Sequence, residues 1–185
     1  MQILGISGSL RRESYNRRLL GVAGRDLPPG VSLTEWAGLA GLPAFDEDRE
    51  ADAPTAVREL RAAIAGADAL LISTPEYNAS LPGALKNALD WASRPFPGSV
   101  LQDKPVAVIG ASTGLFGAVW AQAEARKVLK ASGARVIETE LPFGTAEAAF
   151  GPDGRLVDPE LAQNLRDLLG EIVTEIRAPI EQQAA

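Results

Sequence analysis

The chain opens with MQILGISGSLRRESYN (residues 1–16), in which a short apolar run gives way to a loop of glycine, serine, arginine and asparagine. Residues 2–7, QILGIS, predict a buried strand because they are mostly apolar and are stopped by the Ser7-Gly8 pair. A helical pattern starts directly after the loop, near Ser14, with leucines at helical spacing. A strand, a glycine-containing loop and a helix in this order are typical of the first unit of an α/β fold.

The same alternation of strand and helix continues along the chain. Further strands are expected at residues 31–37, 68–74, 104–112 and 134–141, and helices at residues 14–26, 54–65, 82–93, 118–132 and 158–179. Such an alternation predicts a five-stranded parallel sheet with helices on both faces. The second strand alternates polar and apolar residues and therefore belongs at an edge, which makes 2-1-3-4-5 the simplest order. This is the flavodoxin-like, doubly wound α/β arrangement, and residues 1–185 are expected to form one domain.

Two absent residue types restrict the chemistry of this 185-residue chain. It has no cysteine, which excludes disulfides and cysteine-ligated metals, and no histidine, which excludes Ser-His-Asp triads and histidine-bound zinc. We therefore expect no metal site. A net charge of −6 argues against bulk attraction to nucleic acid or to an anionic membrane. No apolar run is long enough to span a bilayer and no signal peptide is recognisable, so a cytoplasmic location is expected.

Three polar loops follow the first, third and fourth expected strands, at residues 7–16, 74–82 and 111–117. In a doubly wound sheet, ligands bind beyond the carboxyl ends of the strands, where the strand order reverses. The three loops are expected to meet at that place and to form a ligand site there.

The first of these loops has the composition of an anion site. Ser9, Ser14 and Asn16 offer hydroxyl and amide groups. Arg11 and Arg12 supply positive charge, and the following helix directs its N-terminal N–H groups at the same place. The loop lacks both the GKS or GKT of a nucleoside triphosphate site and the GxGxxG of a dinucleotide site. A mononucleotide phosphate fits better, and the alternative is a polar loop in which Ser14 only caps the helix.

The other two loops carry groups suited to a flat ring. In PEYNASLPG, Pro75 restricts the backbone and Tyr77 stands between polar residues, so backbone groups there can contact the edge of a heterocycle. In ASTGLFG, Ser112 and Thr113 can flank a ring or form the floor of a pocket. Either loop taken alone is also compatible with an ordinary surface turn.

Together, the three loops resemble one family, the NAD(P)H-dependent FMN reductases of flavodoxin-like fold, which include bacterial quinone, chromate and azo reductases. The family's first motif, GSxRxxSxN, is matched in full, and its second, PEYN, is followed by the family's PGxLKNAxDW helix start. The matching residues are Gly8, Ser9, Arg11, Ser14 and Asn16, then Pro75, Glu76, Tyr77 and Asn78, then Pro82, Gly83, Leu85, Lys86, Asn87, Ala88, Asp90 and Trp91. The resemblance spans residues 1–140. The third loop departs from the family pattern of serine followed by paired glycines, because Leu115, Phe116 and Ala118 stand near those positions.

The resemblance implies an FMN site built from all three loops. The residues implied to surround the FMN phosphate are Ser9, Arg11, Ser14, Tyr15 and Asn16. Those implied to line the isoalloxazine edge are Pro75, Glu76, Tyr77 and Asn78, and those implied to contact the flavin from the third loop are Ser112, Thr113 and Gly114. No catalytic acid or base is assigned, because the loop carboxylate of Glu76 is expected to be solvated.

The implied reaction passes hydride from NADPH or NADH through FMN to a small electron acceptor such as a quinone, free flavin or a metal oxyanion. The resemblance also implies a homodimer or homotetramer with Lys86 and Trp91 at its interface, although core packing explains Trp91 equally well. Two other interpretations remain at this point. One is a flavodoxin-type electron carrier that does not oxidise nicotinamide, and the other is a non-enzymatic module that binds a phosphate ligand.

Overall fold

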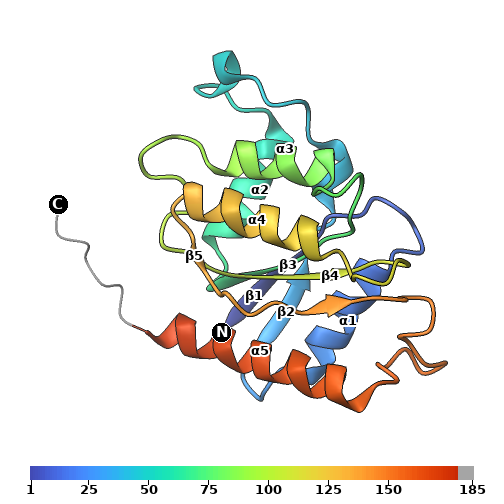
Figure 1. Cartoon of the computed structure of the whole chain (residues 1–185). Coiled ribbons are helices and arrows are strands. Elements are labelled where there is room, and N and C mark those ends of the chain that lie inside the picture. Colours follow the sequence, from blue (N-terminus) through green and yellow to red (C-terminus); the bar gives the residue numbers. More distant parts are fainter. Residues whose placement is uncertain (179–185) are drawn as a thin grey trace.

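Parallel strands form the centre of the computed structural model, which describes residues 1–178 (Figure 1). From one edge to the other lie β2 (Ser32–Glu35), β1 (Gln2–Ser7), β3 (Ala69–Ser73), β4 (Pro105–Ala111) and β5 (Arg135–Val136). The predicted order 2-1-3-4-5 is therefore confirmed, and the half-polar strand β2 lies at the edge as expected. Strands β3 and β4 are buried at every position because helices cover both of their faces.

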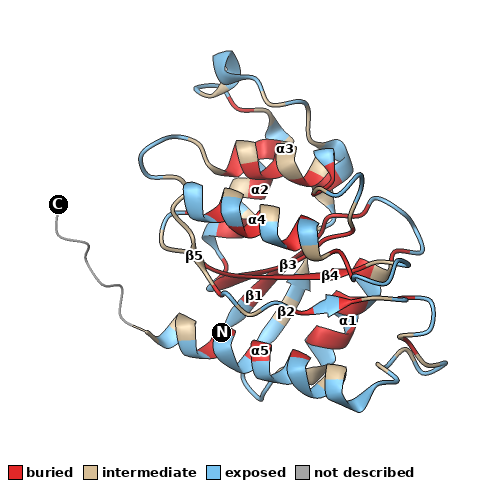
Figure 2. Ribbon diagram, viewed as in Figure 1, coloured by how far each residue is buried: buried red, intermediate tan, exposed pale blue. Residues whose placement is uncertain are grey.

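Helices pack on both faces of the sheet (Figures 1 and 2). One face carries α1 (Tyr15–Asp26) and α5 (Pro159–Arg177), and the other carries α2 (Thr55–Ala65), α3 (Gly83–Ala92) and α4 (Val119–Ala131). In Figure 2 the buried side of these helices faces the strands. The five predicted helices are confirmed. The last was expected to reach residue 179, which lies outside the described residues.

The fifth strand is shorter than the sequence predicted. Of the expected strand at residues 134–141, only β5 forms, and the chain returns to β4 further along as β6 (Pro142–Phe143). Between the two, Glu140 turns toward α4 and pairs with Arg126 at 2.9 Å. The period-two pattern of ARVIETEL does not reveal that detour.

Each face of the sheet has its own apolar core. Successive residues of β1 alternate between the two, so that Ile3 packs beneath α1 and α5 while Leu4 packs beneath α2, α3 and α4.

Trp91 on α3 is fully buried, and its indole Nε1 donates to the carbonyl oxygen of Pro43 at 2.9 Å. Core packing therefore accounts for Trp91 within a single chain. On the same helix, Lys86 pairs with Asp90 at 2.7 Å.

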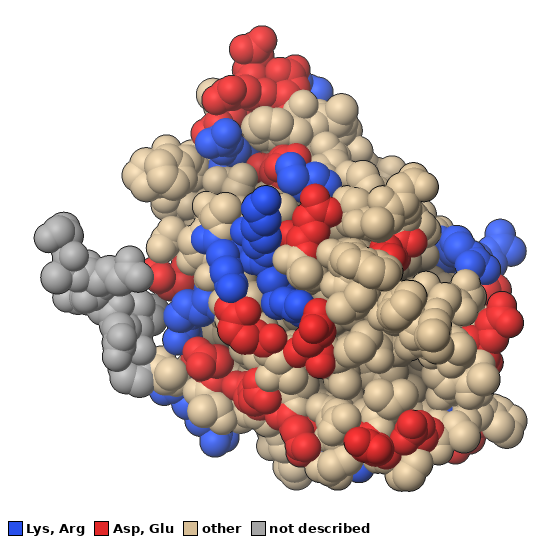
Figure 3. Space-filling view, viewed as in Figure 1, with Lys and Arg blue, Asp and Glu red and all other residues tan. Residues whose placement is uncertain are grey.

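Charges of both signs are interspersed over the face shown in Figure 3, apart from an acidic tip. That tip is the projecting loop between β2 and α2, which carries the short 3₁₀ helix η2 (Glu47–Arg49). The tip lies far from the carboxyl edge of the sheet. None of the helices described in residues 1–178 has the length and apolarity needed to cross a bilayer.

Candidate functional site

The three polar loops meet at the carboxyl edge of the sheet, as the sequence predicted. The backbone N–H of Gly8 donates to Ser73 O at 2.8 Å, and that of Thr74 donates to Ile109 O at 2.9 Å, so the strand ladders continue into the loops. Between the loops lies a pocket lined by Ser9, Arg11, Ser14, Tyr15, Asn16, Pro75, Glu76, Tyr77, Ala111, Ser112 and Thr113. Every predicted site residue except Asn78 and Gly114 is part of this lining.

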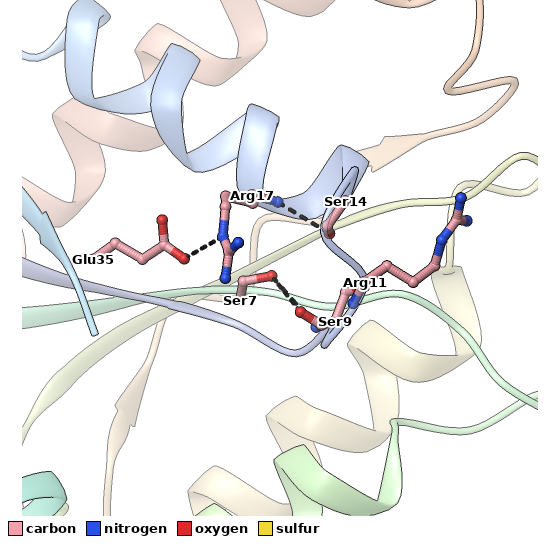
Figure 4. Close-up of polar contacts among 6 residues, drawn as sticks. All are labelled: Ser7, Ser9, Arg11, Ser14, Arg17 and Glu35. Carbon is pink, nitrogen blue, oxygen red and sulfur yellow. Dashed lines mark hydrogen bonds and ion pairs between the residues drawn. The ribbon is translucent and has the colours of Figure 1, made fainter. Parts of the chain in front are cut away.

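Hydrogen bonds within the first loop hold two serines at the pocket (Figure 4). The backbone N–H of Ser9 donates to Ser7 Oγ at 3.3 Å. Ser14 Oγ accepts from the backbone N–H of Arg17 at 3.3 Å, which makes Ser14 the N-cap of α1. Both Ser9 and Ser14 are buried although they belong to a loop. The hydroxyl of Ser14 therefore caps the helix and lines the pocket at the same time.

Arg11 is the basic side chain of this pocket. Figure 4 shows its side chain extending away from Ser9 and Ser14, and the residue is exposed. Arg17 is held elsewhere, because its Nε lies 2.7 Å from Glu35 Oε1 on β2. The N-terminus of α1 adds partial positive charge to the same place. The combined field favours an anionic group.

Asn16 ties this loop to the two central strands. Its Oδ1 accepts from Ser73 Oγ and from the backbone N–H of Ala111, both at 2.9 Å. Its Nδ2 donates to the carbonyl oxygen of Ala111, also at 2.9 Å. The side chain is buried, so these bonds form away from water. The geometry gives the Asn16 amide a structural task, namely joining the start of α1 to the carboxyl ends of β3 and β4.

The two predicted residues outside the lining are turned away from it by local backbone geometry. Asn78 has a φ of 54° at the exposed tip of the second loop. Gly114 is tied to its own loop by its N–H, which donates to Ser112 Oγ at 3.1 Å, and to the segment after β6 by its carbonyl oxygen, which accepts from Thr145 N at 3.0 Å. Turn geometry of this kind is not encoded in a motif match.

Glu76 is not the solvated carboxylate that we expected. Its Oε2 accepts from the backbone N–H groups of Trp120 at 3.0 Å and Ala121 at 3.2 Å, in the first turn of α4. The signal in the sequence is Ala118 at the N-cap of α4, whose side chain cannot accept a hydrogen bond. The helix therefore needs an acceptor from elsewhere.

A second, apolar pocket adjoins the first, and sequence reasoning missed it. Its lining consists of Gly8, Leu10, Arg11, Tyr77, Pro82, Gly83 and Ala84, and its volume is about 340 Å³. Arg11 and Tyr77 belong to both linings. The available signal was Leu10, a large apolar residue that is exposed within an otherwise polar loop.

Among residues 1–178 we find no group of three or more acidic side chains arranged to hold a metal ion.

Comparison with known proteins agrees with this geometry. The family model of the NADPH-dependent FMN reductases matches residues 1–148. An NAD(P)H-dependent FMN reductase of Pseudomonas aeruginosa is 42% identical over 179 residues, covering 96% of each chain. A 2-hydroxy-1,4-benzoquinone reductase of a Burkholderia species is 36% identical, covering 96% of this chain and 97% of its own.

Solved structures give the same result. The NAD(P)H:(acceptor) oxidoreductase FerB of Paracoccus denitrificans superimposes with a TM-score of 0.83 and 35% identity, covering 95% of this chain and 96% of its own. Because the family model matches most of the chain and these relatives match over nearly their whole length, the chain belongs to the NADPH-dependent FMN reductase family.

Proposed function

We propose that this protein is an NAD(P)H-dependent FMN reductase that passes hydride from NADPH or NADH, through FMN at the carboxyl edge of the sheet, to a small electron acceptor. The observation that carries the proposal is that residues from both family motifs and from the third loop line one pocket. In this proposal the chain acts as a single FMN-binding domain in the cytoplasm, where reduced nicotinamide is available.

The donor set at the start of α1 fits a phosphate dianion. Ser9 and Ser14 supply hydroxyls and Arg11 supplies a guanidinium. Tyr15 and Asn16 occupy the first helical positions, whose backbone N–H groups lack partners within the helix. Hydrogen bonds to charged groups contribute about 1.5–3 kcal/mol each. A few of them, after ordering costs, support binding in roughly the micromolar range.

The second and third loops would hold the flavin ring. Pro75 and Tyr77 line the pocket from the second loop, and Ser112 and Thr113 line it from the loop after β4. When bound, FMN supplies a group that accepts hydride from nicotinamide and gives it to the acceptor. The side chains of this protein then need only bind, orient and shield the reactants, a task that requires neither histidine nor cysteine.

Quinones are the acceptor class that we propose. Two relatives are named 2-hydroxy-1,4-benzoquinone reductase and quinone reductase. The apolar pocket beside Leu10, Tyr77 and Ala84 suits a flat, uncharged ring. Free flavin and metal oxyanions are further acceptors to test. We also propose a homodimer or homotetramer, in keeping with the family resemblance.

The test is an anaerobic titration. The purified protein is mixed with FMN, NADPH or NADH is added, and the flavin absorbance is followed before and after addition of a benzoquinone. Rapid bleaching by nicotinamide and reoxidation by the quinone are expected. Bound FMN that stays oxidised with both nucleotides would instead indicate an electron carrier. A protein that does not bind FMN would be a module for another phosphate ligand.

A further inference from the structure

The N-terminus of α4 has an unusual start. Ala118, at the N-cap, has a left-handed backbone conformation with φ 62° and ψ 33°, and it offers no capping side chain. Helix N-termini present unpaired backbone N–H groups, which a side-chain oxygen normally satisfies. Here that oxygen comes from Glu76, 44 residues earlier in the chain, which accepts from Trp120 N and Ala121 N. The second loop thus caps the helix that follows the third loop.

A second carboxylate ties the same two segments together one turn further along. Glu124 on α4 accepts from Ser80 Oγ at 2.5 Å and from the backbone N–H of Leu81 at 3.4 Å. Glu76 thus makes its contacts near the beginning of the second loop, and Ser80 and Leu81 make theirs at its end. The loop is held to α4 on both sides of the turn at its tip.

These contacts bear directly on the pocket. Glu76 lines it from the second loop together with its neighbours Pro75 and Tyr77, while Ser112 and Thr113 line it from the third loop, which leads into α4. A carboxylate that joins the second loop to α4 therefore links two segments that line one pocket. A negative charge at a helix N-terminus also interacts favourably with the helix dipole.

We propose that Glu76 is a positioning residue, which shapes the flavin pocket by capping α4 across the gap between the second and third loops. This inference rests on the proposed function, because it assigns Glu76 a task toward FMN. It differs from a purely structural role in one respect. A helix cap that only stabilises the fold would change stability without changing the affinity for FMN.

The test compares two helix caps of the same chemistry. Asp158 caps α5 by accepting from Glu160 N at 2.8 Å and Leu161 N at 3.3 Å, and it does not line either pocket. Glu76→Ala and Asp158→Ala each remove a carboxylate that accepts two backbone N–H groups. The melting temperature of the apoprotein and the dissociation constant for FMN, measured by quenching of flavin fluorescence, are determined for both variants.

Both variants are expected to melt about 3 °C below the wild type. Only Glu76→Ala should bind FMN about tenfold more weakly, which corresponds to about 1.4 kcal/mol. Glu76→Gln keeps an acceptor oxygen at the same reach, and its dissociation constant should return to within about threefold of the wild type.

Equal FMN affinity in Glu76→Ala and wild type would overturn the inference while leaving the proposed function intact. So would equal losses of affinity in Glu76→Ala and Asp158→Ala, since these would reflect general destabilisation. If the wild type itself does not bind FMN, the proposed function fails and the inference fails with it, a result distinct from either of these.

Discussion

Tyr77 and Ser80 exchange two backbone hydrogen bonds, Tyr77 N to Ser80 O at 3.0 Å and Ser80 N to Tyr77 O at 3.1 Å. The two residues between them, Asn78 and Ala79, both have positive φ, of 54° and 59°. This is the geometry of a tight two-residue turn that favours Asn followed by Gly. Asn78 thus serves the turn that presents Tyr77 to the pocket, and Ala79 occupies a position where glycine is the preferred residue.

Replacing that alanine should stabilise the protein. A left-handed conformation costs a residue other than glycine about 1–2 kcal/mol in the folded state, and a glycine would avoid this cost. Glycine also increases the conformational entropy of the unfolded chain, which cancels part of the stabilisation. We expect Ala79→Gly to raise the free energy of unfolding by about 0.5 kcal/mol. The control is Ala62→Gly on the exposed side of α2, which should lower it by about 1 kcal/mol. Urea denaturation of the two variants measures both changes, and a destabilised Ala79→Gly would contradict the argument.

Arg11 should contribute to FMN affinity in a way that Arg12 does not. Both side chains are exposed, but only Arg11 lines the pocket. Removing one hydrogen bond to a charged group costs about 1.5–3 kcal/mol, so Arg11→Ala should weaken FMN binding at least tenfold. Arg12→Ala should change it less than about twofold, within the range of a screened surface charge. Fluorescence titration at low and high salt provides the measurement, and equal effects of the two variants would argue against a specific phosphate contact.

Loss of the Asn16 side chain should lower stability more than an ordinary surface change. Asn16→Ala leaves Ser73 Oγ and both backbone polar groups of Ala111 without their partner in a buried place. Unsatisfied buried groups cost about 1–3 kcal/mol each, and partial relaxation reduces their sum. We therefore expect a loss of about 3 kcal/mol in urea denaturation. The exposed Asn164→Ala on α5 is the control, with an expected change below about 0.5 kcal/mol.

The positions of the first four strands were predictable because each is bounded by a clear signal, and the half-polar second strand indicated the order. The QILGIS run stops at Ser7-Gly8, and the run before Pro75 is apolar and short. The predicted strand at 134–141 formed only in part, as β5, because its pairing with β4 lapses before β6, and the period-two pattern gives no sign of that gap. Periodicity reports which face a residue prefers, not which distant partner it will find.

For the site as well, the sequence predicted the positions of residues but not their distant partners. Motif residues such as Ser9 and Ser14 line one pocket at the carboxyl edge of the sheet, because the loop between β1 and α1 must begin and end there. The tasks of Asn16 and Glu76 were not predictable, since Asn16 bonds to the ends of β3 and β4 and Glu76 to the first turn of α4, all distant in sequence. A motif match names a residue type at a position. It does not say whether the side chain faces the ligand or the scaffold.

Gly144 provides a test of the third loop, where the sequence departs from the family pattern. A Cβ added to Gly144 would lie 2.1 Å from the carbonyl oxygen of Leu115, so the loop must move to accept any side chain. Because Ser112 and Thr113 line the pocket just before Leu115, we expect Gly144→Ala to destabilise the protein by about 2 kcal/mol and to weaken FMN binding. Gly170→Ala on α5 is the matched control, since a Cβ there meets no atom within 4 Å and should add about 0.5–1 kcal/mol of helix stability. Thermal unfolding measures the stability of both variants, and fluorescence titration measures their affinity for FMN. A Gly144→Ala protein with unchanged FMN affinity would mean that the third loop does not shape the flavin site.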